Sequence, residues 1–140
     1  MTTAIDTNVL IALWYKDDAL NMLALSAMDA AMARGNLVIS APVFAELLAA
    51  PTRTEAFIEY FLKEAGIAVD WDIEEQIWRI AGRSFQNYAK RRRKQEDAGP
   101  RRILADFLIG AHALRRGYRL LTLDDRLYRF AFPRLSIVTA

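Results

Sequence analysis

The sequence predicts an α/β protein in which helices cover both sides of a parallel sheet. Short β-rich runs alternate with longer amphipathic helical segments along the 140 residues. The runs at 37–40 (LVIS) and 67–69 (IAV) are too apolar for one face of the sheet to be exposed to solvent, which is typical of buried parallel strands. Sheets of this kind bind ligands in the crevice at the carboxyl ends of their strands, so we expect any chemistry at that edge.

Each predicted strand is a short apolar run that lies between turn or helix signals. Three glycines, Gly35, Gly66 and Gly117, stand where a helical pattern stops and a strand pattern starts, as expected for helix C-terminal caps. The expected strands are 3–6, 37–40, 67–69, 118–122 and 135–138.

The predicted helices are recognised by their first-turn residues. Thr7 and Asn8 can cap the first helix, and Pro42 occupies a first-turn position. Asp72 followed by Glu75 has the spacing of a capping box. The expected helices are 7–34 with a break near 16–18, 42–50, 54–65, 72–94, 102–116 and a short helix after 124.

Composition indicates a single globular domain over residues 1–140. Hydrophobic residues make up 54% of the chain and charged residues 26%, which excludes a disordered chain. The sequence has no cysteine, so disulfides, thiolate metal sites and cysteine nucleophiles are excluded. The start MTTAIDTNVL lacks a secretory signal pattern, and no apolar run reaches the ~18 residues of a membrane span. We therefore expect a soluble cytoplasmic protein.

Positive charge is concentrated in one segment, residues 90–102 (KRRRKQEDAGPRR). This segment holds seven of the 19 basic residues and only two of the 17 acidic ones. A mildly acidic body with one basic segment indicates a polyanionic partner that approaches at one place. The alternative interpretation is a solvated helix end and loop.

Four acidic residues lie within strongly apolar segments of the sequence, AIDTNVL, VFAELLAA, ILADFLIG and LLTLDDRL. They are Asp6, Glu46, Asp106 and Asp124. A carboxylate in apolar surroundings is costly unless it is paired or bound to a metal. Asp6 ends the first predicted strand and Asp124 follows the strand 118–122, while the other two lie near the starts of helices. All four can therefore converge on the carboxyl edge of one sheet.

Other common types of catalytic site are excluded because the sequence lacks their motifs. The glycines fall singly, without a phosphate-binding or nucleophile-elbow pattern, and His112 is the only histidine. His112 lies between apolar neighbours and is interpreted as a packing or surface residue. Clustered carboxylates repel one another, and a hard cation such as Mg²⁺ or Mn²⁺ relieves that repulsion through oxygen ligands. The chemistry of such a site would be metal-assisted phosphodiester hydrolysis. The spacing alone does not decide between this site and a set of helix caps and salt bridges.

Four segments, each with one of these acids, resemble the PIN-domain ribonucleases, and in particular the VapC-type toxins of bacterial toxin–antitoxin pairs. The segments are AIDTNVLIAL, VISAPVFAELL, RRILADFLIGAHAL and GYRLLTLDDRLYR. The resemblance covers nearly the whole chain and is specific because the four occur in this order. It implies a three-layer α/β/α sandwich around a short parallel sheet. It also implies Mg²⁺- or Mn²⁺-dependent cleavage of single-stranded or looped RNA.

The resemblance further implies roles for the acids. Asp6 and Asp106 would be the principal metal ligands. Glu46 and Asp124 would complete the acidic cluster, either through water or by holding a second metal.

Supporting positions follow from the same resemblance. Asn8 matches the polar residue two positions after the first acid, and Thr122 matches a hydroxyl position near the site. Asp125 adjoins Asp124 and is the alternative fourth acid, although it can instead cap the short helix after it.

The resemblance implies three partners: RNA, a VapB-like antitoxin and a second copy of the chain in a homodimer. An amphipathic antitoxin segment would occupy an apolar groove, which the stretch 20–32 could supply if it is not buried core. Trp14 and Tyr15 could stack RNA bases or belong to the core or that groove. The cations available to RNA phosphates beside Asp106 are Arg91, Arg92, Arg93, Lys94, Arg101 and Arg102.

Two other functions compete with the nuclease. A phosphoaspartate protein would also place an aspartate at a strand end, but here Asn8 replaces the second acid of its motif. None of the four lysines follows the last predicted strands, where such a protein needs one. A non-catalytic RNA-binding or protein-interaction module on the same fold would be favoured by the loss of one of the four acids.

Overall fold

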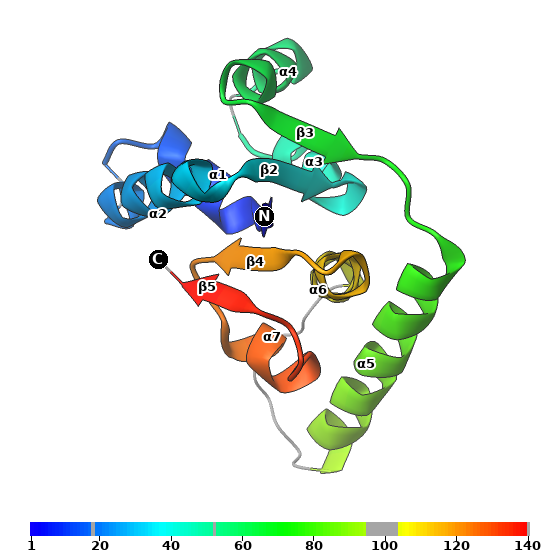
Figure 1. Cartoon of the computed structure of the whole chain (residues 1–140). Coiled ribbons are helices and arrows are strands. Elements are labelled where there is room, and N and C mark those ends of the chain that lie inside the picture. Colours follow the sequence, from blue (N-terminus) through cyan, green and yellow to red (C-terminus); the bar gives the residue numbers. More distant parts are fainter. Residues whose placement is uncertain (18, 52, 95–103, 140) are drawn as a thin grey trace.

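The computed structural model describes residues 1–139 apart from 18, 52 and 95–103, and for 93 and 94 it describes only the helical backbone. Within these residues one parallel sheet has the strand order β3-β2-β1-β4-β5 (Figure 1). All five predicted strands are confirmed, with ends displaced by one or two residues. The strands are β1 (Thr2–Ile5), β2 (Asn36–Ser40), β3 (Ile67–Asp70), β4 (Arg119–Thr122) and β5 (Ile137–Thr139).

Helices pack on both faces of this sheet, so the predicted three-layer α/β/α sandwich is confirmed (Figure 1). The predicted break near 16–18 separates the first two helices, and positive φ angles at Gly66 and Gly117 end two others. In the part of the chain that is described, no helix is long and apolar enough to cross a membrane. The helices are α1 (Thr7–Trp14), α2 (Asn21–Arg34), α3 (Ala41–Leu48), α4 (Glu55–Glu64), α5 (Glu75–Lys94), α6 (Leu104–Arg116) and α7 (Arg126–Ala131).

The central strand β1 lies at the point where the chain reverses its direction across the sheet. From β1 the chain moves outward to β2 and β3, and then returns to place β4 on the other side of β1. Ile5 pairs with Leu121, and the Asp6 N–H donates to the Leu121 carbonyl at 2.9 Å. The residues that follow β1 and β4 are therefore neighbours, at the position where open α/β sheets bind ligands.

The core fills the space between the sheet and its helices. Its largest fully buried side chains include Ile39 on β2, Leu121 on β4 and Phe107 on α6. Trp14 is 9% exposed and meets Phe57 and Phe61 edge to face. Trp14 therefore belongs to the core, so of the two interpretations of this residue the structure favours core packing over base stacking.

Two predicted helix caps are wrong. Asp6, and not Thr7 or Asn8, caps α1, because Asp6 has extended backbone angles and its Oδ1 accepts from the Thr7 N–H at 2.7 Å. Asp72 does not form a capping box with Glu75. The Asp72 N–H instead donates to Asp70 Oδ1 at 3.1 Å, in a turn that precedes α5.

A polar cluster ties the end of β3 to α6. His112 Nε2 lies 2.9 Å from Asp70 Oδ2, and Arg116 Nε donates to the same oxygen at 3.2 Å. Burial alone would raise the pKa of Asp70, but the hydrogen bond from His112 and the Arg116 charge lower it. Burial also lowers the pKa of His112, against the opposing effect of Asp70. A neutral imidazole that donates to a carboxylate accounts for both directions, and His112 is a buried structural residue, which agrees with the packing interpretation.

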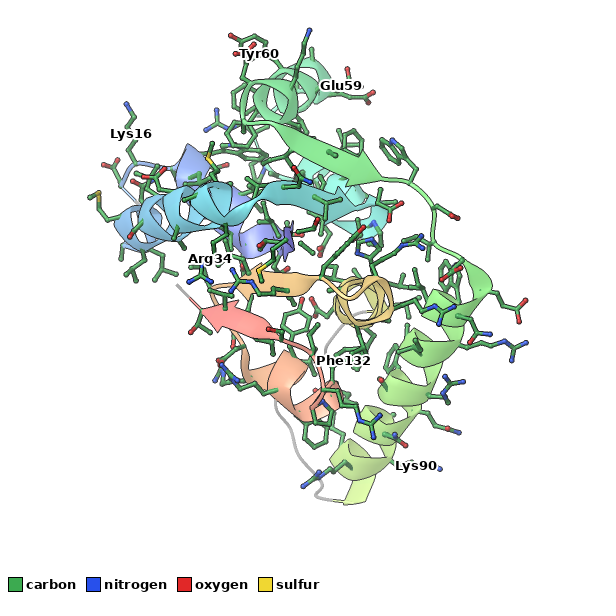
Figure 2. All side chains as sticks on the ribbon, viewed as in Figure 1. Lys16, Arg34, Glu59, Tyr60, Lys90 and Phe132 are labelled. Carbon is green, nitrogen blue, oxygen red and sulfur yellow. The ribbon has the colours of Figure 1, made fainter. Side chains whose placement is uncertain are left out.

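Helix α6 packs tightly against the C-terminal part of the chain at Gly110. A Cβ at Gly110 would lie 2.3 Å from Cε2 of Phe132, whose ring is buried beside α6 (Figure 2). We expect Gly110→Ala to lower the free energy of unfolding in urea by about 1–3 kcal/mol through overpacking. Gly82→Ala, in exposed α5 where a Cβ meets nothing within 4 Å, should leave stability unchanged or raise it by up to about 1 kcal/mol. Equal effects of the two substitutions would contradict the packing model.

The buried His112 predicts a pH-dependent loss of stability. Its pKa in the folded protein lies below the ordinary 6.5, so below that pH the unfolded chain binds more protons than the folded one. Stability from this group is therefore complete above about pH 6.5 and is lost as the pH falls. His112→Gln keeps an N–H donor without titrating. We expect wild type to lose stability relative to this variant between pH 7 and 5 in denaturant titrations, whereas parallel curves would contradict the assignment.

Candidate active site

A pocket of about 260 Å³ opens over the carboxyl ends of β1 and β4. The structure brings all four predicted acids to its wall, although they come from positions up to 118 residues apart in the chain. Its walls also include polar groups that can hold or orient an acid. The lining residues are Asp6, Thr7, Asn8, Ile11, Glu46, Asp106, Asp124, Leu127 and Tyr128.

Asp6 is the most buried acid of the pocket and is only 6% exposed. It follows β1 directly, so the central strand fixes its backbone. Its Oδ1 accepts from the Thr7 N–H at 2.7 Å and its Oδ2 accepts from the Thr122 hydroxyl at 2.8 Å. Burial raises the pKa of Asp6 to about 6, and the nearby charge of Asp106 adds to this, while hydrogen bonds from Thr122 and Tyr128 oppose it. The position therefore favours a cation next to the carboxylate.

Glu46 and Asp106 face the pocket from two helices. Glu46 lies in α3, and its Oε1 accepts from the Thr7 hydroxyl at 2.6 Å. Asp106 lies in the first turn of α6 and is partly exposed. The Thr7 residue thus contacts two acids at once, Asp6 through its backbone and Glu46 through its side chain.

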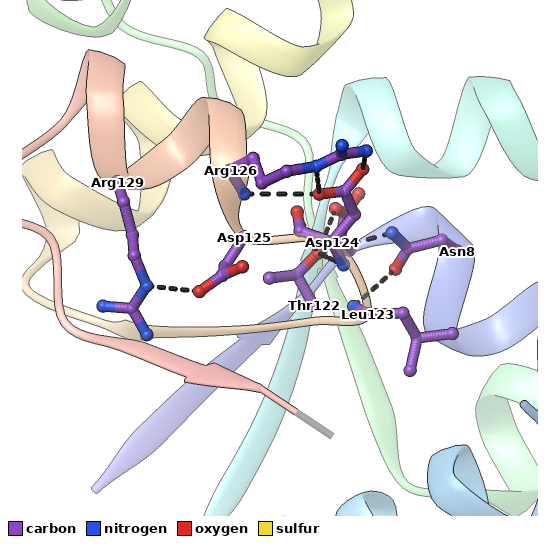
Figure 3. Close-up of polar contacts among 8 residues, drawn as sticks. Asn8, Thr122, Leu123, Asp124, Asp125, Arg126 and Arg129 are labelled. Carbon is purple, nitrogen blue, oxygen red and sulfur yellow. Dashed lines mark hydrogen bonds and ion pairs between the residues drawn. The ribbon is translucent and has the colours of Figure 1, made fainter.

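The structure separates the adjacent acids Asp124 and Asp125 (Figure 3). Asp124 lines the pocket, and its carboxylate accepts from Arg126 at 3.1 Å through each oxygen. Asp125 pairs with Arg129 one helical turn away and does not line the pocket. Asp125 occupies the N-cap position of α7 but makes no side-chain cap hydrogen bond. The predicted Asp125 cap is therefore wrong, since Asp124 Oδ1 accepts from the Arg126 N–H at 3.3 Å instead.

Thr122 connects the pocket's polar groups. Its buried hydroxyl donates to Asp6 and accepts from Asn8 Nδ2 at 3.3 Å and from the Asp124 N–H at 3.1 Å. Asn8 in turn accepts from the Leu123 N–H at 3.2 Å (Figure 3). The donor and both acceptor positions of the hydroxyl are thus used, and the loop after β4 is fixed against the start of α1.

Tyr128 is a pocket residue that the sequence pattern missed. It lies in α7, is 3% exposed and contributes to the pocket wall. From the sequence alone, a tyrosine at this position of an amphipathic helix looks the same whether it lines a pocket or packs in the core. The only available signal is its place four residues after Asp124.

The acidic side chains of the pocket offer carboxylate oxygen atoms as metal ligands, which Mg²⁺ and Mn²⁺ prefer. Among the residues that the structure describes, no three acidic or histidine side chains gather closely enough to enclose an ion. Glu46 is drawn toward Thr7 and Asp124 toward Arg126, which keeps the carboxylates apart. The pocket therefore fits a cation that takes one or two carboxylates and keeps several waters, which is the usual behaviour of Mg²⁺.

The basic segment is described only in part. Arg91 is exposed near the end of α5, and its guanidinium lies 4.5 Å from the centroid of the Phe130 ring on α7. Arg92 is partly buried. Helix α7 also supplies Leu127 and Tyr128 to the pocket wall, so Arg91, which lies on α5, contacts a helix that borders the site. Arg101, Arg102 and the side chains of Arg93 and Lys94 lie outside the described residues.

Comparison with known families agrees with the fold and the acid-lined pocket. The chain belongs to the PIN domain family, whose model matches residues 3–133. The resemblance inferred from the four acidic segments is therefore confirmed. No curated protein sequence matches the chain.

Solved structures of similar fold come from bacterial toxin–antitoxin systems. The chain is similar to VapBC2 from Rickettsia felis, solved with a DNA fragment from their promoter, with a TM-score of 0.72, 17% identity and coverage of 99% of this chain and 98% of that one. It is similar to VapBC-1 from nontypeable Haemophilus influenzae, with a TM-score of 0.68, 20% identity and the same coverage of 99% and 98%. It is also similar to Mycobacterium tuberculosis VapC20, a sarcin-ricin loop cleaving toxin, with a TM-score of 0.58, 14% identity and coverage of 89% and 92%.

The hydroxyl of Thr122 should matter more to stability than its size indicates. Thr122→Val keeps the side-chain shape but removes one hydrogen bond each from Asp6 Oδ2, Asn8 Nδ2 and the Asp124 N–H. We expect a loss of about 1–3 kcal/mol in the free energy of unfolding, measured in urea with EDTA present.

Thr3→Val is the matched control. Thr3 is 1% exposed on β1 and its side chain makes no hydrogen bond within the described part of the chain. The control should unfold at the same urea concentration as wild type or a higher one. If both substitutions destabilised the protein equally, the network around Thr122 would not be the cause.

Proposed function

We propose that this chain is a metal-dependent endoribonuclease toxin of a toxin–antitoxin pair, built on one PIN-like domain that spans residues 1–140. It would hydrolyse RNA phosphodiester bonds with Asp6, Glu46, Asp106 and Asp124. The observation that carries the proposal is the convergence of these four carboxylates, from four separate segments, on one pocket at the reversal point of the sheet. The stability of the fold gives no reason for this cluster, because burial of Asp6 near the like charge of Asp106 disfavours its ionised form.

Mg²⁺ or Mn²⁺ would be held chiefly by Asp6 and Asp106. When bound, the cation activates water and neutralises charge on the phosphate oxygens. Asp6 is held for this task by donors on both of its oxygens, so its orientation is set before any ligand arrives. Glu46, fixed by Thr7, and Asp124, fixed by Arg126, would hold waters or a second ion at the pocket wall. Asn8 and Thr122 would support these ligands and would not bind the metal themselves.

RNA as the substrate is supported by two features. VapC20, which shares the fold, is a sarcin-ricin loop cleaving toxin. The basic residues of α5 and of the segment after it carry the charge needed to attract phosphates, and Arg91 lies over the Phe130 ring of α7, the helix that supplies two pocket residues. The RNA-binding residues would be Arg91, Arg92, Arg93, Lys94, Arg101 and Arg102. Asp125, paired with Arg129 outside the pocket, would not take part in cleavage.

A VapB-like antitoxin and a homodimeric state complete the proposal, with the protein acting in the cytoplasm. Structures of similar fold are VapBC complexes. Helix α2 exposes several large apolar side chains, which suits a partner better than it suits water. These side chains are Met22, Leu23, Leu25 and Met32.

Cleavage of a labelled RNA pool by the purified protein tests this function. We expect discrete cuts with Mn²⁺ or Mg²⁺ and none with EDTA. Asp6→Asn and Asp106→Asn should each lower the cleavage rate by about 100-fold or more, because each removes a metal ligand. Asp124→Asn should also slow cleavage.

Two substitutions of the same type serve as controls. Asp125→Asn, next to Asp124 but outside the pocket, and Asp29→Asn, on exposed α2, should cleave at the wild-type rate. Cutting that survives EDTA and Asp6→Asn would contradict the metal mechanism. A protein that binds RNA without cutting it under any of these conditions would instead support the non-catalytic module.

A further inference from the structure

The buried hydroxyl of Tyr128 lacks a conventional partner. Tyr128 is 3% exposed, and within the described residues its Oη makes no hydrogen bond of normal geometry. It nevertheless lies close enough to Asp6 for its hydroxyl to lower the pKa of that carboxyl. A phenylalanine would fill the same space without leaving a polar atom unsatisfied, and buried polar groups normally have partners. The hydroxyl therefore calls for a role that packing does not supply.

The acids around Tyr128 favour a role of its hydroxyl as a donor. Burial together with the charges of Asp6, Asp106 and Glu46 holds the pKa of Tyr128 far above its ordinary value. A tyrosine hydroxyl is protonated at neutral pH even at its ordinary pKa of about 10, and the pocket wall includes four carboxylates that accept hydrogen bonds when ionised. Asp6 is the acid that its hydroxyl already influences most directly.

The lone pairs of Asp6 show what this donor would change. An ionised carboxylate has about four acceptor directions. Thr7 uses one on Oδ1 and Thr122 uses one on Oδ2, at 2.7 and 2.8 Å. A third donor would leave Asp6 one direction toward the pocket, so that it could meet a cation through a single oxygen in a fixed orientation.

On the basis of the proposed metal-dependent nuclease, we infer that Tyr128 is a positioning residue, whose hydroxyl donates to the Asp6 carboxylate and fixes the oxygen that Asp6 presents to the cation. Outer hydrogen bonds of this kind orient metal ligands and commonly change metal affinity by about 10- to 100-fold. The role belongs to the tyrosine hydroxyl and not to its ring, which packs beside Leu127 at the pocket wall.

Mn²⁺ binding to Tyr128→Phe tests the inference without an activity measurement. Free Mn²⁺ is followed by its electron paramagnetic resonance signal during titration of the purified protein. We expect the variant to bind Mn²⁺ about 10-fold more weakly than wild type. Its melting temperature in EDTA should stay close to that of wild type, because the substitution keeps the ring and Asp6 keeps its hydrogen bonds from Thr7 and Thr122. With RNA as substrate, kcat should fall while KM changes little.

Tyr118→Phe is the matched control. Tyr118 packs edge to face on His112, with ring centroids 5.8 Å apart, and does not line the pocket. It should bind Mn²⁺ with wild-type affinity. If Tyr128→Phe also bound Mn²⁺ as tightly as wild type, the positioning role would be wrong while the proposed nuclease stood. If wild type bound no Mn²⁺ and cut no RNA, both would fall.

Discussion

The hydrogen bond from Thr122 to Asp6 joins the two strands on which the candidate site depends. It spans the reversal point of the sheet, where the ends of β1 and β4 are adjacent because the strand order is β3-β2-β1-β4-β5. Parallel strands require crossovers, so these neighbours are separated by most of the chain. The same hydroxyl accepts from Asn8 and from the backbone after β4. One buried threonine therefore orients the central acid and also fixes the loop that carries the fourth acid.

The arrangement has a free-energy cost, because it buries the carboxylate of Asp6. A carboxylate that is 6% exposed resists ionisation, and Asp106 adds repulsion. Neutral donors from Thr7 and Thr122 lessen the cost but do not remove it, since the pKa still rises to about 6. Natural chains retain such local conflicts mainly where function requires them. The local conflict at Asp6 is what the proposed cation site would require.

Much of the fold and the acids of the site could be predicted from the sequence, because both follow from periodicity. Within the described residues, apolar runs and helix start and stop signals predicted each strand and helix. Acids in apolar segments predicted that Asp6 and Asp106 would meet at one edge of the sheet, and both line the pocket there. Caps were predicted less well, since Asp72 has capping-box spacing but its backbone turns toward Asp70. The choice between Asp124 and Asp125 needed the start of α7, where one arginine each draws the two carboxylates in different directions. Tyr128 could not be found, because a pocket tyrosine and a core tyrosine occupy the same place in an amphipathic pattern.

A comparison of Asp6 with Asp70 shows why burial alone does not identify a site. Asp6 follows the central strand β1 and Asp70 is the last residue of the edge strand β3, so both lie at the same end of the sheet. Burial opposes ionisation of both carboxyl groups. Asp70 has a histidine donor and an arginine charge from this chain, so its pKa is lowered and its charge is balanced within the fold. Within the described residues, the hydrogen-bond donors to Asp6 are neutral, and the charge that raises its pKa is that of another acid, Asp106. The carboxylate of Asp70 is paired with cationic and donor groups of the protein, whereas no described cationic side chain offsets the burial of Asp6, as expected for the metal ligand that we propose.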